Sequence, residues 1–357
     1  MKLFSRRKRM PERPVPSLSL AQRQALEVAG VPPGAIPYET YRQMLTDSMV
    51  QTALTIKRLA VLSAPWKITL TQDSPEGRRR KAFIEEAFSQ MQGSPGTLLA
   101  GAMDAFALGW SIQEVEWHLV GGTILPRRVL PRDPGLFGMQ VSETGEVQAL
   151  TLRVPGEREQ SLPREKFILF SHRNGYGRVK GQSDLDAAYP HWRAKQGLMA
   201  AWRVHLDRYA SPTVAARYQR GLPPAERDGL LSALRNLSQH TAIIYPEEID
   251  LTTLGGDRGS STGFMEAVEF HNREMARAIL GQTLTTDEGR RVGSLALGRV
   301  HLQVMLLQVA ALRRELADQV MTEQLVKPLI EMNFGPGPVP VFEFEETDLD
   351  AFRTGKT

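Results

Sequence analysis

The sequence predicts an α+β protein in which helices predominate, and three observations carry this prediction. Long stretches repeat apolar residues at helical spacing. Shorter stretches alternate apolar and polar residues, or are uniformly apolar between Gly and Pro turns. The two kinds of segment follow one another along the chain, as in α+β folds. With 357 residues and 41% hydrophobic content, the chain is long enough for roughly two to three domains.

Residues 38–182 are expected to form one α+β domain. Its first helix is predicted from Tyr38 to Ser63, because apolar residues recur there at helical spacing and Ala64-Pro65 stops it. Two more helices are expected at Glu76–Met91 and Gly96–Leu108. Strands are expected in the segments "WKITLT", "SIQEVEWHLV", "GGTILPRRVLPRD", "GEVQALTLRV" and "KFILFSH".

A capping box, "SDLD", opens a long helix expected over residues 183–210. The Ser183 hydroxyl can accept a bond from a backbone N–H one turn in, and Asp186 can bond back. Pro190 is expected to kink this helix because it lacks an N–H and crowds the preceding turn.

The second half of the chain is expected to alternate helices with a small mixed segment. Residues 211–262 are predicted to hold a helix near Pro224–Leu237 and two strands, "TAIIYP" and "IDLTTL". A helix at Phe264–Leu280, a polar loop at residues 282–294 and a long helix at Leu295–Val326 follow. The segment "VPVFEFEE" is expected to close the fold as a strand.

Charge is distributed unevenly. Six of the 44 basic residues and one of the 40 acidic residues lie in the first thirteen, so the remaining chain is close to neutral. A protein that grips DNA phosphates tightly usually shows a larger basic excess. Residues 1–37 are therefore expected to be a basic, Pro-rich arm, which contacts nucleic acid, a membrane surface or a protein, or is a solubilising tail.

Several classes of protein are excluded or disfavoured. The chain has no cysteine, which excludes disulfides. It has no apolar run long enough for a helix that spans a bilayer, and its N-terminus lacks the apolar core typical of a secretory signal. The segment "GYGRVKGQSD" lacks the spacing of a phosphate loop. No histidine spacing indicates a metal site, and Glu266 with Glu269 fits a solvated helix face better than a cation site. We expect no enzyme activity, no cofactor and no metal.

The segments "AILGQTLTTDEGRRVGSLALGRVH" and "ADQVMTEQLVKPLIEMNFG" resemble the C-terminal half of portal proteins of tailed bacteriophages, specifically the Mu-like group. Upstream, "DSMVQTALTIKRLAVLSAPWKITL" and "FILFSHRNGYGRVKGQSDLDAAYPHW" are similar to parts of the same family. The resemblance covers about residues 38–350. Because few residues follow Asp350, we expect the C-terminal crown of helices found in many portals to be absent or minimal.

The resemblance implies a ring-forming fold with named parts. Residues 38–182 would be the wing, 183–210 and 263–281 the two stem helices, and 211–262 the clip. Residues 282–294 would be the tunnel loop, and residues 295–357 the tunnel helix and the return to the wing.

The resemblance also implies a function. The chain would form a dodecameric ring at one capsid vertex of the virion, assembled in the host cytoplasm, through which double-stranded DNA is packaged and ejected without sequence specificity. The implied partners are the large terminase, a head-tail adaptor, and the major capsid and scaffold proteins, with no membrane. The rival hypotheses are another ring-forming head-tail connector or baseplate protein, and a nucleic-acid enzyme.

Two groups of residues are candidates for contact. In the tunnel loop, hydroxyls and arginines would touch DNA phosphates while acids offset part of the charge: Gln282, Thr283, Thr285, Thr286, Asp287, Glu288, Arg290, Arg291 and Ser294. In the clip, charged residues would meet partner proteins: Arg217, Arg220, Glu226, Arg227 and Asp228. An ordinary interhelical loop and a domain for subunit contacts are the alternatives. The tryptophans are expected to be core or interface anchors rather than platforms for bases.

Overall fold

The computed structural model describes residues 36–142, 145–175, 179–210, 214–237, 242–249, 262–281 and 295–345. The chain divides into two compact units. Unit 1 comprises residues 1–187 and 278–357, and unit 2 comprises residues 188–277. The mixture of helices and sheets confirms the predicted α+β class.

Unit 1 begins with two helices where one was predicted. The expected helix from Tyr38 to Ser63 is interrupted, so that α2 spans Tyr38–Met44 and α3 spans Ser48–Leu62. The cause is Asp47, whose carboxylate accepts hydrogen bonds from the backbone N–H groups of Met49 and Val50. An N-cap of this kind starts a new helix rather than continuing the old one.

The next helices carry clear start signals. Ser74 and Ser94 cap α4 and α5, and a proline follows each of them at the first helical position. The helix predicted at Gly96–Leu108 is divided in the structure, because the first part ends near Met103 and a short second part ends at Gly109, whose φ is 83°. The bounds are Pro75–Gln90 for α4, Pro95–Ala102 for α5 and Ala105–Leu108 for α6.

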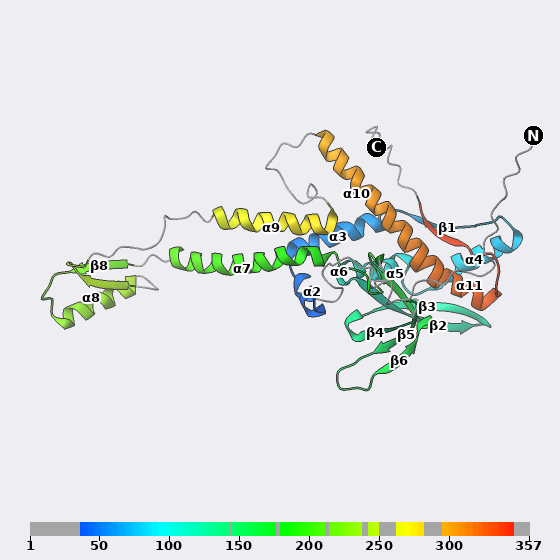
Figure 1. Ribbon diagram of the computed structural model, residues 1–357, viewed down its shortest axis with the longest axis horizontal. Coiled ribbons are helices and arrows are strands. Elements are labelled where there is room, and N and C mark those ends of the chain that lie inside the picture. Colours follow the sequence, from blue (N-terminus) through cyan, green and yellow to red (C-terminus); the bar gives the residue numbers. More distant parts are fainter. Residues whose placement is uncertain are drawn as a thin grey trace, which may run out of the picture. The chain divides into compact units, whose positions relative to one another are not determined.

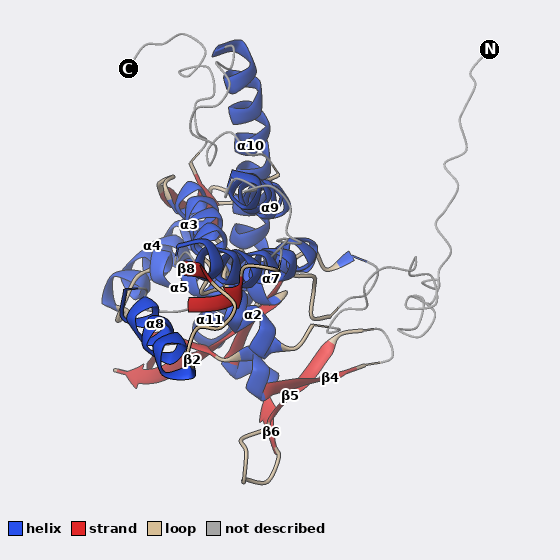
Figure 2. Ribbon diagram, turned by 90° about the vertical axis from the view of Figure 1, so that its left-hand side faces the viewer, coloured by secondary structure: helices blue, strands red, loops and turns tan. Residues whose placement is uncertain are grey.

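The described part of unit 1 also contains three antiparallel sheets. The first has the order β3-β2-β7, the second has the order β4-β5-β6, and the third pairs β1 with β10. Figure 2 shows β4, β5 and β6 grouped together. The strands are β1 Trp66–Thr69, β2 Trp110–Val120, β3 Thr123–Arg132, β4 Phe137–Val141, β5 Val147–Leu152, β6 Gln160–Pro163, β7 Phe167–Ser171 and β10 Val341–Phe344.

Two of the three sheets share an apolar core. One cluster joins Trp110 and Ile112 of β2 with residues of β4, β5 and β7. A second set of contacts involves β10, where Phe342 is fully buried and its ring stacks on Trp66 of β1. The first and last described strands of unit 1 therefore pair with each other, and this pairing ties the two chain segments of unit 1 together.

A long helical stretch, predicted as one helix at Leu295–Val326, is divided into three segments, two α-helical and one π-helical. It comprises α10 (Leu295–Leu316), a π-helical segment (Ala317–Val326) and α11 (Lys327–Phe334). Figure 1 shows α10 lying alongside α3, and the two elements are in contact. The stretch continues past the predicted end at Val326 and ends at Phe334, where Gly335 follows with a φ of 71°.

Unit 2 consists of two helices and a small βαβ segment. Most of α7 (Leu185–Ala210) and α9 (Thr262–Leu280) belongs to it, and Pro190 lies inside α7. Between them, β8 (Val214–Tyr218) pairs in parallel with β9 (Ala242–Pro246), with α8 (Pro224–Leu237) as the connection. The strand β8 was not predicted, and the predicted strand "IDLTTL" lies almost entirely outside the described residues.

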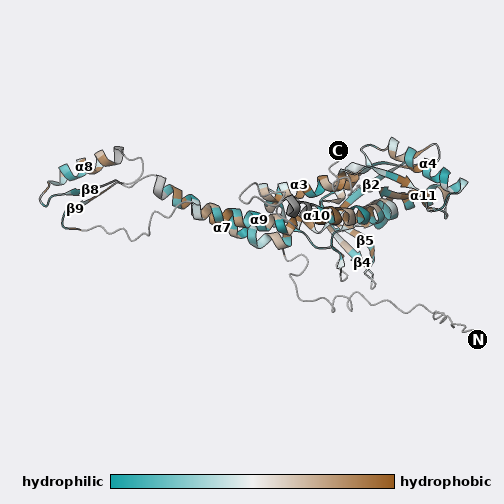
Figure 3. Cartoon of the chain, turned by 90° about the horizontal axis from the view of Figure 1, so that it is seen from above, coloured by the Kyte–Doolittle hydropathy of each residue, from teal (hydrophilic) through white to brown (hydrophobic). Residues whose placement is uncertain are grey.

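Burial differs sharply between the units. The described part of unit 2 buries only Ala188, Met275 and Ala276, whereas the core of unit 1 draws on nearly all of its helices and strands. Figure 3 shows hydrophobic and hydrophilic residues alternating along α7. Several large apolar side chains of unit 2 stay exposed, among them Val204 and Phe270.

Candidate functional site

The structure describes the residues on either side of the predicted tunnel loop, but not the loop itself. Residues 282–294, with all nine of the candidate DNA contacts, lie outside the described residues, so their roles stay predictions. The preceding helix α9 ends at Leu280, and Gly281 follows with a φ of 72°. A Cβ at Gly281 would approach Nε2 of Gln308 on α10 to 2.9 Å, and this flexible amide could move aside, so it is the positive φ that favours glycine here.

A buried ionic cluster holds the start of α7 in unit 1. Asp184 is fully buried, and its carboxylate lies 2.5 Å from Lys57 Nζ of α3. His172 Nε2 and the Arg173 guanidinium, both from the loop after β7, each lie 3.1 Å from its Oδ1. Lys57 Nζ also lies 4.6 Å from the centre of the Phe106 ring. Three segments that are distant in sequence are thereby joined at one carboxylate.

The electrostatics of this cluster favour the ionised acid. Burial opposes ionisation of Asp184, but the hydrogen bond from His172 and the charge of Lys57 hold the pKa of its carboxyl below the usual range. Removing one partner of such a cluster leaves a buried charge uncompensated, which is strongly destabilising. The cluster therefore anchors the start of α7 to α3 and to the loop after β7.

The predicted capping box lies next to this cluster. The Ser183 hydroxyl accepts a hydrogen bond from the Leu185 N–H at 2.9 Å and donates one to the Ala107 carbonyl at 2.6 Å. The Asp186 carboxylate accepts a hydrogen bond from the Tyr41 hydroxyl at 2.5 Å. Both residues of the motif therefore also bind α7 to other helices of unit 1, which the local motif could not indicate.

The π-helical segment presents an amide to a strand edge. Gln324 Oε1 accepts from the Leu169 N–H at 2.8 Å, and its Nε2 donates to the Leu169 carbonyl at 2.7 Å. The side chain thus takes the place of a neighbouring strand on β7. Asn333 of α11 does the same for Ile124 of β3, with distances of 2.8 and 2.9 Å.

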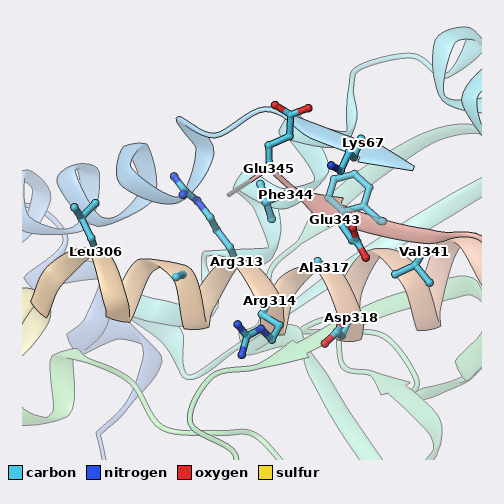
Figure 4. A pocket seen from close by; sticks show the side chains of 12 residues that line it. Lys67, Leu306, Arg313, Arg314, Ala317, Asp318, Val341, Glu343, Phe344 and Glu345 are labelled. Atoms are coloured by element: carbon cyan, nitrogen blue, oxygen red, sulfur yellow. The ribbon is translucent and has the colours of Figure 1, made fainter. Parts of the chain in front are cut away.

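A groove of about 860 Å³ runs between this helical stretch and strands β1 and β10. Figure 4 shows Arg313 extending from α10 toward α3, where it donates to the carbonyls of Ala60 and Val61. Arg314 and Asp318 line the groove as well. Basic and acidic side chains are mixed along it, so the groove concentrates neither charge.

Two pairs of rings join α7 and α9 in unit 2. Nδ1 of His191 and Nδ1 of His271 are 3.1 Å apart, which requires one ring to donate and the other to accept. Burial and the neighbouring His191 both lower the pKa of His271. Further along the two helices, the rings of Trp202 and Phe264 stack with 6.3 Å between centroids.

The candidate clip residues fall into two groups. Arg217 of β8 donates from Nε to the Tyr245 hydroxyl at 3.2 Å, and this bond raises the pKa of the guanidinium. Arg220 in the following turn lies 3.8 Å from Glu248. The remaining three, Glu226, Arg227 and Asp228, lie in the first turns of α8. All five are at the surface of unit 2, and their role in binding stays a prediction.

The tryptophans pack against other side chains. Trp110 is fully buried, Trp66 stacks on Phe342, and Trp192 stacks on Tyr189. Within the described ranges, no group of three metal-ligating side chains lies together. No helix in the described part of the chain is long and apolar enough to cross a membrane.

Comparison with known proteins gives the relatives of this chain. It is 29% identical over 325 residues to the Mu-like prophage FluMu protein gp29 of Haemophilus influenzae, covering 87% of this chain and 60% of that protein. It is 26% identical over 291 residues to the portal protein of Escherichia phage Mu, covering 80% of this chain and 55% of that protein. The chain thus spans little more than half the length of these relatives.

The fold is similar to that of a solved structure. The neck of a native gene transfer agent particle, computed with C12 symmetry, contains a chain that superposes with a TM-score of 0.60 at 13% identity. The match covers 91% of this chain and 88% of that one. The family model for the portal protein of Mu bacteriophage matches residues 38–354. The resemblance seen in the sequence is therefore confirmed, and the chain belongs to the family of Mu bacteriophage portal proteins.

Proposed function

We propose that this chain is a structural component of a phage-like particle, a portal that forms a dodecameric ring at one capsid vertex. The observation that carries the proposal is the family match over residues 38–354. The similar neck chain, which comes from a particle computed with C12 symmetry, supports the ring. Double-stranded DNA would pass through the ring during packaging and ejection.

In this proposal the parts keep the names that the resemblance implies. Residues 38–182 are the wing, and 183–210 and 263–281 are the stem helices. The clip at 211–262 meets the large terminase and later the head-tail adaptor, and the wing meets capsid and scaffold proteins. Assembly takes place in the host cytoplasm. The ring is not an enzyme, so the isolated protein should show no ATP hydrolysis in a turnover assay.

The first experiment is native mass spectrometry of the purified chain, with negative-stain images of the same sample. A closed dodecameric ring with a central hole supports the proposal. A chain that remains monomeric even with its capsid and scaffold partners present contradicts it. The rival connector or baseplate hypothesis predicts that particles lacking the protein still package DNA.

The tunnel loop is tested by removing its paired cations. Arg290→Ala combined with Arg291→Ala should leave ring assembly intact and reduce DNA packaging or retention, because these guanidinium groups would contact passing phosphates. The matched control is Arg78→Ala with Arg79→Ala, an exposed arginine pair on α4 that should leave packaging unchanged. Loss of rings in the first variant would mean that the loop is a subunit interface.

A further inference from the structure

Two histidines of unit 2 face each other across helices α7 and α9. His191 of α7 and His271 of α9 are 80 positions apart in the sequence, and their Nδ1 atoms lie 3.1 Å from each other. The ring centres are 5.4 Å apart, and the ring planes are inclined by 47°. Each ring therefore directs the same kind of nitrogen into the space between the two helices.

The distance between these nitrogens suits two ligands of one metal ion. A bond from an imidazole nitrogen to a divalent transition metal is about 2.0–2.1 Å long. Two such bonds place their nitrogens about 2.9 Å apart when they meet at a right angle, and about 3.3 Å apart when they meet at the tetrahedral angle. The observed separation of 3.1 Å lies between these two values. The two helices thus already hold the rings at the spacing that a metal ion needs.

Both rings can offer a lone pair without any net loss of protons. In the hydrogen bond between them, one neutral ring donates from Nδ1 and the other accepts at Nδ1. When a metal ion binds, the donor ring gives up its Nδ1 proton to water and takes one up at Nε2, so that both Nδ1 atoms carry a lone pair. His191 and His271 are half-buried, so water has access to the pair for this exchange.

The surroundings of the pair add one negative charge. Glu274 follows His271 by one turn of α9, and its carboxylate acts electrostatically on that ring. Glu274 forms an ion pair with Arg277, and no third ligand is in place among the residues that the structure describes. Water molecules would therefore complete the coordination of the ion, and Glu274 would contribute charge rather than a bond.

Unit 2 is the part of the molecule in which a bound ion adds most to stability. Its described part buries few side chains, and ring pairs make the contact between α7 and α9. Units that bury little apolar surface are often stabilised by metal ions. An ion that binds only when the two helices are paired shifts the equilibrium toward the paired state.

We propose that His191 and His271 bind a divalent transition-metal ion through their Nδ1 atoms, and that this ion joins α7 to α9. The ions that suit imidazole ligands are Zn²⁺, Ni²⁺ and Cu²⁺, whereas Mg²⁺ and Ca²⁺ prefer oxygen ligands. No histidine spacing in the sequence indicated this site, because its two ligands come from separate helices. The site belongs to the single chain, so it does not depend on the ring of the proposed function.

Zinc binding by the whole chain tests the proposal. The chain is first freed of metal, and its affinity for Zn²⁺ is then measured by competition with a chromogenic chelator. We expect Zn²⁺ to bind, and an excess of Mg²⁺ to leave it in place. His191→Ala and His271→Ala should each lower the zinc affinity by more than about tenfold, because each removes one of two ligands, and changes beyond the ligands already cost about that much.

The matched control is His205→Ala, which removes an imidazole from the same helix. His205 contacts Phe264 and lies about four turns of α7 from His191, so this variant should bind zinc like the wild type. Hydrogen exchange of the unmodified chain gives a second measurement that needs no variant. Added Zn²⁺ should slow exchange in α7 and α9 around the two histidines, and it should do so in His205→Ala as well.

Three results would overturn the inference. The first is that Zn²⁺, Ni²⁺ and Cu²⁺ all bind the wild type no more tightly than a chain in which both histidines are replaced by alanine. The second is that His205→Ala lowers the zinc affinity as much as the other two variants do. The third is that zinc slows hydrogen exchange elsewhere in the chain but not in α7 and α9. Each of these results leaves the proposed function untouched, because ring formation is measured separately.

Discussion

Unit 1 and unit 2 are stabilised in different ways. Unit 1 buries an apolar core, an ionic cluster and the edges of its strands within one chain. Unit 2 has almost no buried side chain in its described part. Its helices α7 and α9 contact each other through two pairs of rings, His191 with His271 and Trp202 with Phe264. The difference teaches that unit 1 buries enough side chains within one chain to form a core, whereas the described part of unit 2 does not.

The largest expected effect concerns the charge buried in unit 1. Asp184→Asn should lower the free energy of unfolding by about 3–5 kcal/mol, because Lys57 is left buried without its counter-charge. Urea denaturation of the full chain measures this loss. The same exchange at the exposed Asp228 of unit 2 should change stability by less than about 0.5 kcal/mol. Equal losses at the two sites would remove the contrast between the units.

Acid should reveal the same cluster. Because the pKa of Asp184 is lower in the folded chain than in the unfolded one, its stabilising contribution is fully present above about pH 4, the unfolded value. It is lost as pH falls through the folded pKa. The wild type should therefore lose stability in this range more steeply than Asp184→Asn, which has no carboxylate at this position to take up a proton. Parallel urea curves at several acidic pH values provide the comparison.

The same residue type can be compared directly between the units. Trp110→Ala in unit 1 should cost about 3–5 kcal/mol, because the side chain is fully buried and leaves a cavity. Trp202→Ala in unit 2 should cost about 1 kcal/mol in the unassembled chain, since it chiefly loses the stack with Phe264. Chemical denaturation monitored separately for each unit would measure both. A cost at Trp202 as large as that at Trp110 would mean that unit 2 has a core of its own.

The strand-edge amide should have an intermediate effect. Gln324→Leu should cost about 2–3 kcal/mol, because it leaves both backbone groups of Leu169 without their partner. The matched exchange, Gln196→Leu at an exposed position of α7, should stay within about 0.5 kcal/mol. Hydrogen exchange at the Leu169 amide tests the mechanism, and unchanged protection there would contradict it.

The smallest effect concerns the contact between α7 and α9. The pKa of His271 is lowered by burial and by His191, so the contact is stable above the ordinary histidine value of about 6.5 and weakens as pH falls below it. Hydrogen exchange along α7 should accelerate in that range. His271→Asn should flatten this pH dependence, while His118→Asn in unit 1 should leave it unchanged. A flat profile in the wild type would show that the imidazole pair carries no proton-linked stability.

Much of the local structure could be predicted because its causes are local. The capping box "SDLD" indicated the start of α7, and alternation indicated β2. The prediction of one continuous helix at residues 38–63 was wrong, because Asp47 caps a second helix there. Whether an aspartate acts as an N-cap depends on the conformation of the chain around it. The strand β8 was missed because "VAARY" is short and not strongly apolar.

The candidate sites divide in the same way. The residues of the tunnel loop and the clip were chosen by resemblance and composition, and their roles remain to be tested by the variants above. The ionic cluster was not predicted at all, because Lys57 and Asp184 are separated by 127 positions. Only the "SD" at the start of α7 gave a local signal, and that signal indicated a cap rather than a buried charge.

The sequence by itself determined the class of fold, the main helices and the family to which the chain belongs, because periodicity, capping residues and the order of segments are written along the chain. Tertiary structure alone decided the pairing of β1 with β10, the carboxylate shared by three segments, and the contrast between a unit with a core and a unit without one. These features depend on which residues that are distant in sequence come into contact. The free energy of such contacts comes from burial and long-range interactions, which no local pattern encodes.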